Sequence, residues 1–581
     1  MVAPKLRSLS IAVLVSAACA ACVEITSVAP DPAQPGDHVL VGVSNILGPS
    51  FLEPGARLRF DGTTRSLSPD TSSQVGFNLP AATSPGSHLI EVEDQIGLIE
   101  ILTVIYLFRD HDDSRILEVT APPRVVNMIP ASLSGETNQD SEPFLSIRPR
   151  NPALLVGSAF TPNPNGAGSV TAPIFVSTNG GNTWSLVNSV PSQVQTGDIT
   201  HAFDGDGPVR GTLYAGILRR PAAAGSTTTL DELSIDDVTS AGPMTLLSSN
   251  QNTDQPFVTV ATVGGRDRVY VGNNEAFDAA VRPNTATIDL SLDSGATWNS
   301  VRLESRVTFN QDAPSVRASV ARDGVVYAAY LHRTNAAGVN RTTDVVVARD
   351  DAGATGATPF QNLLDGGDGL AGQRVVIGVN IPFINAATLG FERIGSTLSL
   401  AVAPRQSSTV YVAWCDRVGN GDIYTMHVRR SIDSGQNWSN DLRTITNATN
   451  TALAIADDGA VGFLYQQLTN AGAANARWVT HLEQSRDAFV NVQDTVLATT
   501  PANAPASLGL PYLGDYTYLI AQGSAFRGVF SANNTPDVAN FPQGVVYQRS
   551  SNFTTNTLDD GARNPVAISI DPFYFSVQVM P

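Results

Sequence analysis

The sequence predicts an all-β protein with two domains, a small β-sandwich followed by a larger ring of repeated sheets. Its 581 residues exceed the size at which a single hydrophobic core usually stops growing. The chain contains 48 glycines and 36 prolines, and only 15% of its residues are charged, which is typical of short strands joined by turns. A short phrase built on Ser, Asp, Gly and Trp also recurs along most of the chain, which indicates repeated structural units.

Residues 1–21 have the three-part plan of a secretory signal. Lys5 and Arg7 precede an apolar run, and small residues follow it up to Ala21. No later stretch offers the roughly 20 apolar residues that cross a bilayer, so we expect no transmembrane span. We expect export, with the protein either secreted or held at the cell envelope. Cys22 follows two alanines, as in a bacterial lipoprotein signal, and a lipid anchor at Cys22 is an alternative to ordinary cleavage.

The charged and sulfur-containing residues exclude several classes of function. A net charge of −18 repels phosphate backbones, so nucleic acid is not an expected partner. Lys5 is the only lysine, which excludes Schiff-base chemistry and a P-loop lysine from the mature chain. Cys415 is the only cysteine beyond the leader, so no intrachain disulfide is expected. We expect a monomer that requires no cofactor.

Residues 22–107 are predicted to form the small sandwich, with strands near 38–43, 57–61, 73–78, 87–93 and 98–107. Ile25–Pro30, the turn Pro35-Gly36-Asp37 and the phrase Leu58–Gly62 resemble the immunoglobulin-like IPT/TIG family. That resemblance implies a spacer or adhesion module. Residues 108–137 are polar and contain proline, which predicts a linker that can lend a strand to the second domain. Residues 138–581 form the predicted repeat domain.

The repeated phrase is Ser-x-Asp/Asn-x-Gly-x-x-Trp, and three copies are complete. Their defining residues are Ser177, Asn179, Gly181 and Trp184; Ser291, Asp293, Gly295 and Trp298; and Ser431, Asp433, Gly435 and Trp438. Degraded copies are predicted to begin at Ser234, Ala348, Ser485 and Ser550. Four short strands in each interval correspond to one blade of a β-propeller. Seven blades are favoured, and six are the alternative.

The complete copies resemble the Asp box, or BNR repeat, of sialidase-like propellers. That resemblance implies a structural role for the box, in which Ser and Asp bond the turn and Gly takes a positive φ. It also places function at the other end of the propeller, in the loops that lead into the first strand of each repeat. We call these the axial loops, because first strands lie nearest the propeller axis.

The sialidase resemblance implies a set of catalytic residues. Arg317, Arg393 and Arg527 are candidates for an arginine triad that binds a substrate carboxylate, and Tyr516 with Glu275 for a nucleophile and its partner. The first arginine of that family belongs to an Arg-Ile-Pro phrase, and here Glu142-Pro143-Phe144 stands in its place. We therefore expect no efficient cleavage of sialic-acid glycosides.

The axial loops carry acidic residues at corresponding places in successive repeats. Besides Asp140 or Glu142 in the first repeat, they are Asp198, Asp254, Asp312 and Asp515. A closed propeller brings such loops together, and oxygen-rich clusters suit Ca²⁺, so these four aspartates are a candidate calcium site. In the alternative interpretation, each Asp only caps its own loop.

Two functions remain open from the sequence. One is an exported sialidase-like propeller that recognises or hydrolyses glycans at the cell exterior. The other is a scaffold or adhesion propeller that binds a cell-surface protein. A polar pocket at the axial loops would favour the first, and a broad flat apolar patch would favour the second.

Overall fold

The structure, a computed structural model, divides the chain into two compact units, Met1–Pro122 and Pro123–Val579. It describes residues 23–29, 38–45, 57–61, 63–65, 68–71, 74–78, 86–93, 114–119, 123–160, 171–191, 197–204, 211–219, 229–251, 253–275, 285–306, 315–337, 339–419, 421, 423–506 and 510–580. Regular structure in these residues is β apart from three short 3₁₀ segments, so the all-β prediction is confirmed. No helix among them is long and apolar enough to cross a membrane.

The first unit contains two four-stranded antiparallel sheets. One has the order β1 (Val23–Ala29), β2 (His38–Asn45), β6 (Gln74–Asn78), β5 (Ser68–Thr71), and the other β4 (Thr63–Arg65), β3 (Arg57–Phe60), β7 (Gly86–Glu93), β8 (Ser114–Val119). The buried rings of Phe60 and Phe77, one from each sheet, have centroids 5.6 Å apart. The two sheets therefore pack face to face as a β-sandwich.

The boundary predicted at residue 107 is wrong. Strand β8 lies inside the predicted linker, yet it pairs with β7 from Gly86 opposite Val119 to Glu91 opposite Ser114. It belongs to the sandwich because it supplies hydrogen bonds to an otherwise open sheet edge. The strand predicted over 98–107 lies outside the described residues.

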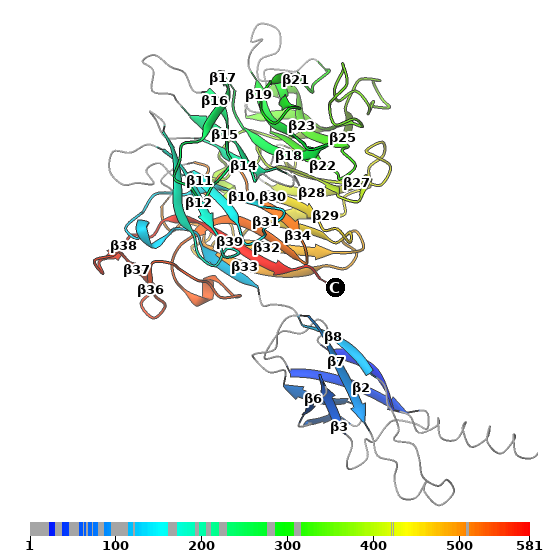
Figure 1. The fold of residues 1–581 in the computed structure, drawn as a ribbon, viewed down its shortest axis with the longest axis vertical. Helices are drawn as coiled ribbons and strands as arrows, with labels where there is room; N and C mark the ends of the chain where they lie inside the picture. Colours follow the sequence, from blue (N-terminus) through cyan, green and yellow to red (C-terminus); the bar gives the residue numbers. More distant parts are fainter. Residues whose placement is uncertain are drawn as a thin grey trace, which may run out of the picture. The chain divides into compact units, whose positions relative to one another are not determined.

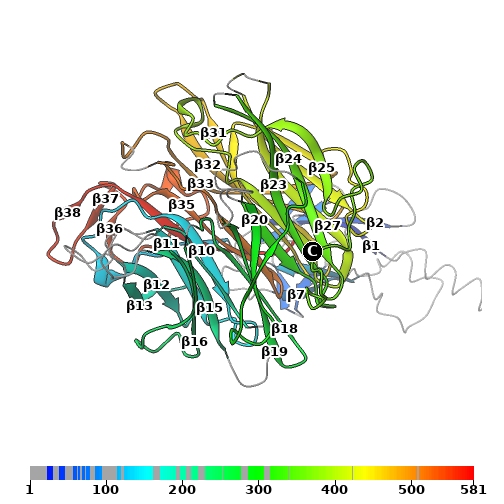
Figure 2. The same cartoon turned by 90° about the horizontal axis from the view of Figure 1, so that it is seen from above.

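The second unit is built from successive four-stranded antiparallel sheets (Figures 1 and 2). The first three are β10 (Ser141–Ile147), β11 (Leu155–Phe160), β12 (Thr171–Ser177), β13 (Ser185–Pro191); β14 (Ile199–Phe203), β15 (Leu213–Arg219), β16 (Thr229–Ile235), β17 (Thr245–Gln251); and β18 (Phe257–Val263), β19 (Arg266–Glu275), β20 (Thr285–Ser291), β21 (Asn299–Arg302). Apolar side chains from neighbouring sheets fill the space between them, as Val156, Leu213 and Leu233 do between the first two.

The next three groups repeat this order. They are β22 (Val316–Val320), β23 (Val326–Ala337), β24 (Asn340–Asp350), β25 (Gln373–Asn380); β26 (Leu398–Ala403), β27 (Gln406–Arg417), β28 (Tyr424–Ser431), β29 (Arg443–Thr446); and β30 (Ala448–Ile455), β31 (Val461–Thr469), β32 (Arg477–Ser485), β33 (Gln493–Pro501). A single pairing, Asn380 with Arg417, joins the first two of these groups at β25 and β27.

The seventh group combines both ends of the unit. Strands β34 (Tyr518–Gln522), β35 (Ala525–Asn533) and β39 (Ile570–Gln578) come from the C-terminal region, and β9 (Arg124–Asn127) pairs with β39 as the outer strand. The first strands contact one another in the order β10, β14, β18, β22, β26, β30, β34, and β34 contacts β10 again. This closed ring of radial sheets is a β-propeller.

An insertion separates β35 from β39. It contains the short 3₁₀ segment Val538–Asn540 and a three-stranded sheet, β36 (Ser550–Asn552), β37 (Thr557–Asp559) and β38 (Pro565–Val566), at the edge of the unit (Figures 1 and 2). The other 3₁₀ segments are Ala131–Leu133 and Ala387–Leu389. The degraded box predicted at Ser550 is wrong, because the third strand of this blade is β39 and Ser550 belongs to the insertion.

Candidate functional site

The three complete boxes form the same hydrogen-bonded turn after the third strand of their blades. The Ser291 hydroxyl donates to Asp293 Oδ1 at 3.0 Å and accepts from the Gly295 N–H at 2.8 Å. Asp293 Oδ1 also accepts from the Thr297 N–H at 2.8 Å. Matching bonds join Ser177, Asn179, Gly181 and Thr183, and again Ser431, Asp433, Gly435 and Asn437. The box side chains are therefore occupied by the turn.

The tryptophans of the boxes face neighbouring cores. Trp184 is buried against Tyr574 of the seventh blade, with ring centroids 5.6 Å apart. The indole N–H groups of Trp298 and Trp438 donate to the carbonyls of Gly295 and Gly435, at 3.1 Å and 3.0 Å. Each box thus ties its own turn to the packing between blades.

Two degraded boxes lie at a different register from the prediction. The boxed serine occupies the third-strand position opposite the start of the second strand, as Ser291 does opposite Val269. Ile235 and Asp350 hold that position in the second and fourth blades, in place of the predicted Ser234 and Ala348. The Asp350 carboxylate accepts the Ala354 N–H at 2.9 Å and so replaces the serine hydroxyl.

The axial loops lie at the other end of the propeller from the boxes. A box follows the end of a third strand, which runs in the same direction as the first strand in an antiparallel sheet. Asp198, Asp254 and Asp515 instead precede the first strands β14, β18 and β34. These three aspartates therefore lie near the axis, together with Glu142 at the start of β10.

The buried Asp515 forms an ion pair with the half-buried Arg393. Arg393 Nε donates to Asp515 Oδ1 at 2.6 Å, and a second guanidinium N–H of Arg393 donates to Oδ2. The Gln255 side-chain amide adds a third bond to Oδ2 at 3.2 Å. The Arg393 guanidinium also lies 4.4 Å from the ring centroid of Phe383. Arg393 is thus committed to a protein carboxylate and an aromatic ring.

Asp198 and Glu142 are the protonatable groups of this cluster. Burial, and then the charge of Asp254, raises the pKa of Asp198 to about 7. Burial, and then the charge of Asp198, also raises the pKa of Glu142 well above its usual range. The buried carboxyl group of Asp198 faces the side chains of Tyr516 and Glu142. At neutral pH this end of the axis therefore holds carboxyl groups that retain protons.

Four aromatic rings and one arginine close the axis below the carboxyl groups. The Phe144 ring stacks on Tyr518 with centroids 3.9 Å apart and meets Phe257 edge-on at 5.2 Å. The Arg317 guanidinium lies 4.3 Å from the Phe257 centroid and 5.9 Å from that of Tyr516. We call Phe144, Phe257, Tyr516, Tyr518 and Arg317 the axial plug.

Tyr516 connects the plug to the carboxyl groups. Its hydroxyl is buried and faces the carboxyl group of Asp198. Burial, and then the charges of Asp198 and Glu142, holds the pKa of Tyr516 well above its usual range. The hydroxyl therefore stays protonated and faces the acidic cluster as a hydrogen-bond donor.

The plug repeats one local geometry in two blades. Glu142-Pro143-Phe144 and Gln255-Pro256-Phe257 occupy corresponding places, and Glu142 and Gln255 both have positive φ, 57° and 58°. The turn directs the Glu and Gln side chains to the acidic cluster and the following Phe into the plug. The shared phrase was visible in the sequence, but its turn geometry was not predicted.

The structure brings most of the predicted residues together. Asp198, Asp254, Asp515, Arg393, Arg317 and Tyr516 belong to one network of contacts and charges. It does not bring Arg527 there, because that residue lies on the second strand β35 and donates to the Pro152 carbonyl at 2.9 Å. Glu275 ends β19, but its side chain lies outside the described residues, as do Asp312 and Cys22.

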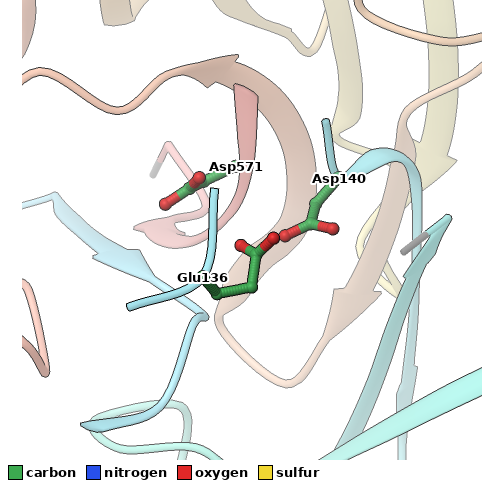
Figure 3. A group of neighbouring side chains, drawn as sticks. All are labelled: Glu136, Asp140 and Asp571. Carbon is green, nitrogen blue, oxygen red and sulfur yellow. The ribbon is translucent and has the colours of Figure 1, made fainter. Parts of the chain in front are cut away.

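A separate acidic cluster lies where β39 meets the start of the second unit. Among the described residues, only Glu136, Asp140 and Asp571 place three carboxylate oxygens within 4.8 Å of one another, and Figure 3 shows Glu136 facing Asp140. Asp571 accepts hydrogen bonds from Asn127 at 2.7 Å, Asn534 at 2.9 Å, Ser569 at 2.6 Å and from Arg549. These donors satisfy the Asp571 carboxylate within the protein.

The predicted calcium aspartates form no comparable group. Asp198, Asp254 and Asp515 do not meet within 4.8 Å as a set of three among the described residues. Asp515 is also neutralised by Arg393. Asp312, the fourth predicted ligand, lies outside the described residues, so the calcium site stays a prediction.

No match was found among known protein families or curated proteins. Among solved structures, a variant of an α-L-arabinofuranosidase from Fusarium graminearum is 12% identical, over 60% of this chain and 93% of that one, with a TM-score of 0.38. An α-L-arabinanase from Penicillium chrysogenum is 12% identical, over 78% and 98%, with a TM-score of 0.38. An ulvan-binding polysaccharide lyase is 10% identical, over 68% and 92%, with a TM-score of 0.39. Similarities this low do not assign a function.

Proposed function

We propose that this protein is an exported, glycan-acting propeller whose active site is the acidic cluster at the axial loops. The observation that carries the proposal is Asp198, a buried carboxyl group with its pKa raised to about 7, beside the half-buried carboxylate Asp254. Two carboxyl groups held in different protonation states are what glycosidic bond hydrolysis requires. Export is proposed from the leader-like residues 1–21.

Each residue of the cluster has a role in this reaction. Asp198 gives its proton to the glycosidic oxygen as the bond between that oxygen and the anomeric carbon breaks. Asp254 is the carboxylate that acts opposite it, on a water molecule or on the anomeric carbon itself. Tyr516 offers its hydroxyl proton to a sugar oxygen. Arg393 and Asp515 are positioning residues, because each is committed to the other.

The cluster favours neutral glycans over anionic ones. Arg393 is paired with Asp515, and Arg317 lies inside the plug, where its guanidinium donates to the carbonyls of Leu398 and Ser396. Neither is free to bind a substrate carboxylate at the axial loops. The charge of Asp254 repels an anion there. Efficient cleavage of sialic-acid glycosides is therefore not expected.

The test is hydrolysis of a panel of nitrophenyl glycosides of neutral sugars, with a sialoside beside them. Asp198→Asn should lower turnover about 100-fold or more while the melting temperature is kept, because general acid catalysis contributes factors of that size. Asp433→Asn, in a box at the other end, is the matched control and should keep full turnover. Turnover of the sialoside, or full activity of Asp198→Asn, would contradict the proposal.

The rival functions give different results. A protein that turns over no glycoside but is retained on a glycan array, with binding weakened by Asp198→Asn, would be a glycan-binding propeller. A protein with neither glycoside turnover nor glycan binding would favour the scaffold interpretation, in which the propeller binds another protein.

A further inference from the structure

A cavity lies on the propeller axis, on the other side of the plug from the acidic cluster. It has a volume of about 340 Å³ and is lined by the first strands of five blades, β18, β22, β26, β30 and β34. Arg317 and Tyr516 line its inner end. Arg322, Pro404 and Asp457, which follow first strands and so lie at the box end, line its mouth. Arg322 and Asp457 are 59% and 41% exposed, so this end meets solvent.

The charges of this cavity are opposite to those of the acidic cluster. Its charged lining residues are Arg317, Arg322 and Asp457. At the mouth, Asp457 is shared by two arginines, Arg322 at 2.7 Å and Arg405 at 3.2 Å, so this group carries a net positive charge. A cavity with cationic groups at both ends concentrates anions, even in a protein whose net charge is −18.

Arg317 is the recognition group at the closed end. It is only 3% exposed, and no carboxylate of the described residues lies within ion-pair distance of its guanidinium. Its hydrogen bonds run to the carbonyls of Leu398 at 3.2 Å, Ser396 at 3.3 Å and Val316 at 3.4 Å, so its hydrogen-bond acceptors are uncharged. The carboxyl groups of Asp198 and Asp515 act on its charge without forming an ion pair. Burial lowers the pKa of Arg317 to about 10, which still leaves it charged at neutral pH. An anion beside it would relieve that cost.

The walls between these charges are apolar or weakly polar. Leu400, Val402, Leu453, Ile455 and Leu519 line the cavity with small residues such as Ala401 and Ala521. One further polar atom is available, because the Thr451 hydroxyl is buried and has no hydrogen-bond partner among the described residues. The lining therefore fits a ligand with an apolar body and one anionic end that accepts hydrogen bonds.

We propose that the axial cavity binds an aliphatic monocarboxylate, with the carboxylate at Arg317 and Thr451 and the chain along the walls toward the mouth. A volume of about 340 Å³ lies in the range of small-ligand sites. The site lies on the other side of the plug from the proposed glycan site, and Tyr516 of the plug borders both. The proposal does not rest on the glycan activity.

Calorimetric titration of the purified protein with hexanoate at low chloride tests the proposal. Hexanoate should bind at least about tenfold more tightly than hexanol or hexylammonium, since only the carboxylate pairs with a guanidinium. Butanoate should bind roughly tenfold more weakly than hexanoate, because each buried methylene contributes about 0.8 kcal/mol. Equal binding of hexylammonium, or no binding of hexanoate, would overturn the proposal.

Three variants locate the binding. Arg317→Gln should abolish hexanoate binding, and Ala521→Phe should abolish it by filling the cavity while Arg317 is kept. The matched control is Arg486→Gln, which removes an arginine paired with Asp458 outside the cavity and should leave affinity unchanged. Binding that survives Ala521→Phe in a folded protein would overturn the proposal, even if Arg317→Gln fails to fold.

Discussion

Gly514 packs against Glu142 so closely that a Cβ atom at position 514 would lie 2.6 Å from the Glu142 Cγ atom. Gly514 also has a φ of +98°, which side chains rarely adopt. The loop before β34 and the loop before β10 can approach each other only because this residue has no side chain. The position of Glu142 in the acidic cluster therefore depends on a residue of another blade.

Gly514→Ala should displace Glu142 and lower both stability and turnover. We expect a loss of about 1–3 kcal/mol in the free energy of unfolding, from the strained φ and the close contact together. Gly459→Ala is the matched control, because its φ is +92° but nothing lies within 4 Å of the added Cβ. Thermal unfolding and glycoside turnover of both variants measure the difference. Equal effects of the two would show that the contact with Glu142 is unimportant.

Arg393→Met should destabilise the propeller by about 3–5 kcal/mol, because it leaves Asp515 buried without its counter-charge. Arg322→Met breaks a solvent-exposed pair with Asp457 and should cost less than about 1 kcal/mol. Denaturant unfolding compares the two. The double variant Arg393→Met/Asp515→Leu should recover much of the loss, since it removes both charges. An Arg393→Met variant as stable as the parent would argue against the pair of Arg393 with Asp515.

Stability should fall as the pH rises from about 4 to 7. The folded-state pKa of Asp198 is raised to about 7, so the native protein holds a proton that the unfolded chain releases in this window. The free energy of unfolding therefore decreases until the pH passes the folded-state pKa of Asp198. Above that pH the stabilisation from the bound proton is lost. Melting temperatures at pH 5 and pH 8 test the sign, and Asp198→Asn should reduce the dependence. A parent protein more stable at pH 8 than at pH 5 would contradict it.

Ser431→Ala should cost about 1–2 kcal/mol of stability without changing turnover. The change removes the acceptor of the Gly435 N–H, which is buried in the box turn. Ser550→Ala is its counterpart at a position where the sequence suggested a box and the structure has an exposed strand of the insertion; its effect should stay within about 0.5 kcal/mol. Chemical denaturation of the two variants gives the comparison, and equal losses would restore Ser550 as a box residue.

The repeated phrase was enough to predict the fold, because a turn with its own hydrogen bonds keeps its sequence in each blade. The box predicted at Ser550 was wrong because Ser-Ser-Asn matches only the start of the phrase and lacks the Gly and Trp of a complete box. Strand β8 was missed because Ser114–Val119 lies beyond a polar segment that resembles a linker. In both cases the pairing partner, which a local pattern does not contain, decided the assignment.

The candidate site was predictable in part. Asp198, Asp254 and Asp515 were found because their place in the repeat puts them at the axis. Arg393 and Arg527 could not be distinguished by sequence, although one pairs with Asp515 and the other lies on a second strand away from the axis. The role of each arginine depends on the blade that faces it across the ring, and that blade is distant in the sequence.

The pairing of β9 with β39 sets the order in which the molecule can be completed. Asn127 and Asp571, which bond each other where these strands meet, are 444 positions apart in the chain. As a nascent chain emerges from its N-terminus, the earlier blades can form from neighbouring segments, whereas the seventh waits for Ile570–Gln578. Until then β9 has no partner strand and the ring stays open. A chain that loses this last strand would lose its circular closure, a cost far larger than nine residues of sequence would suggest.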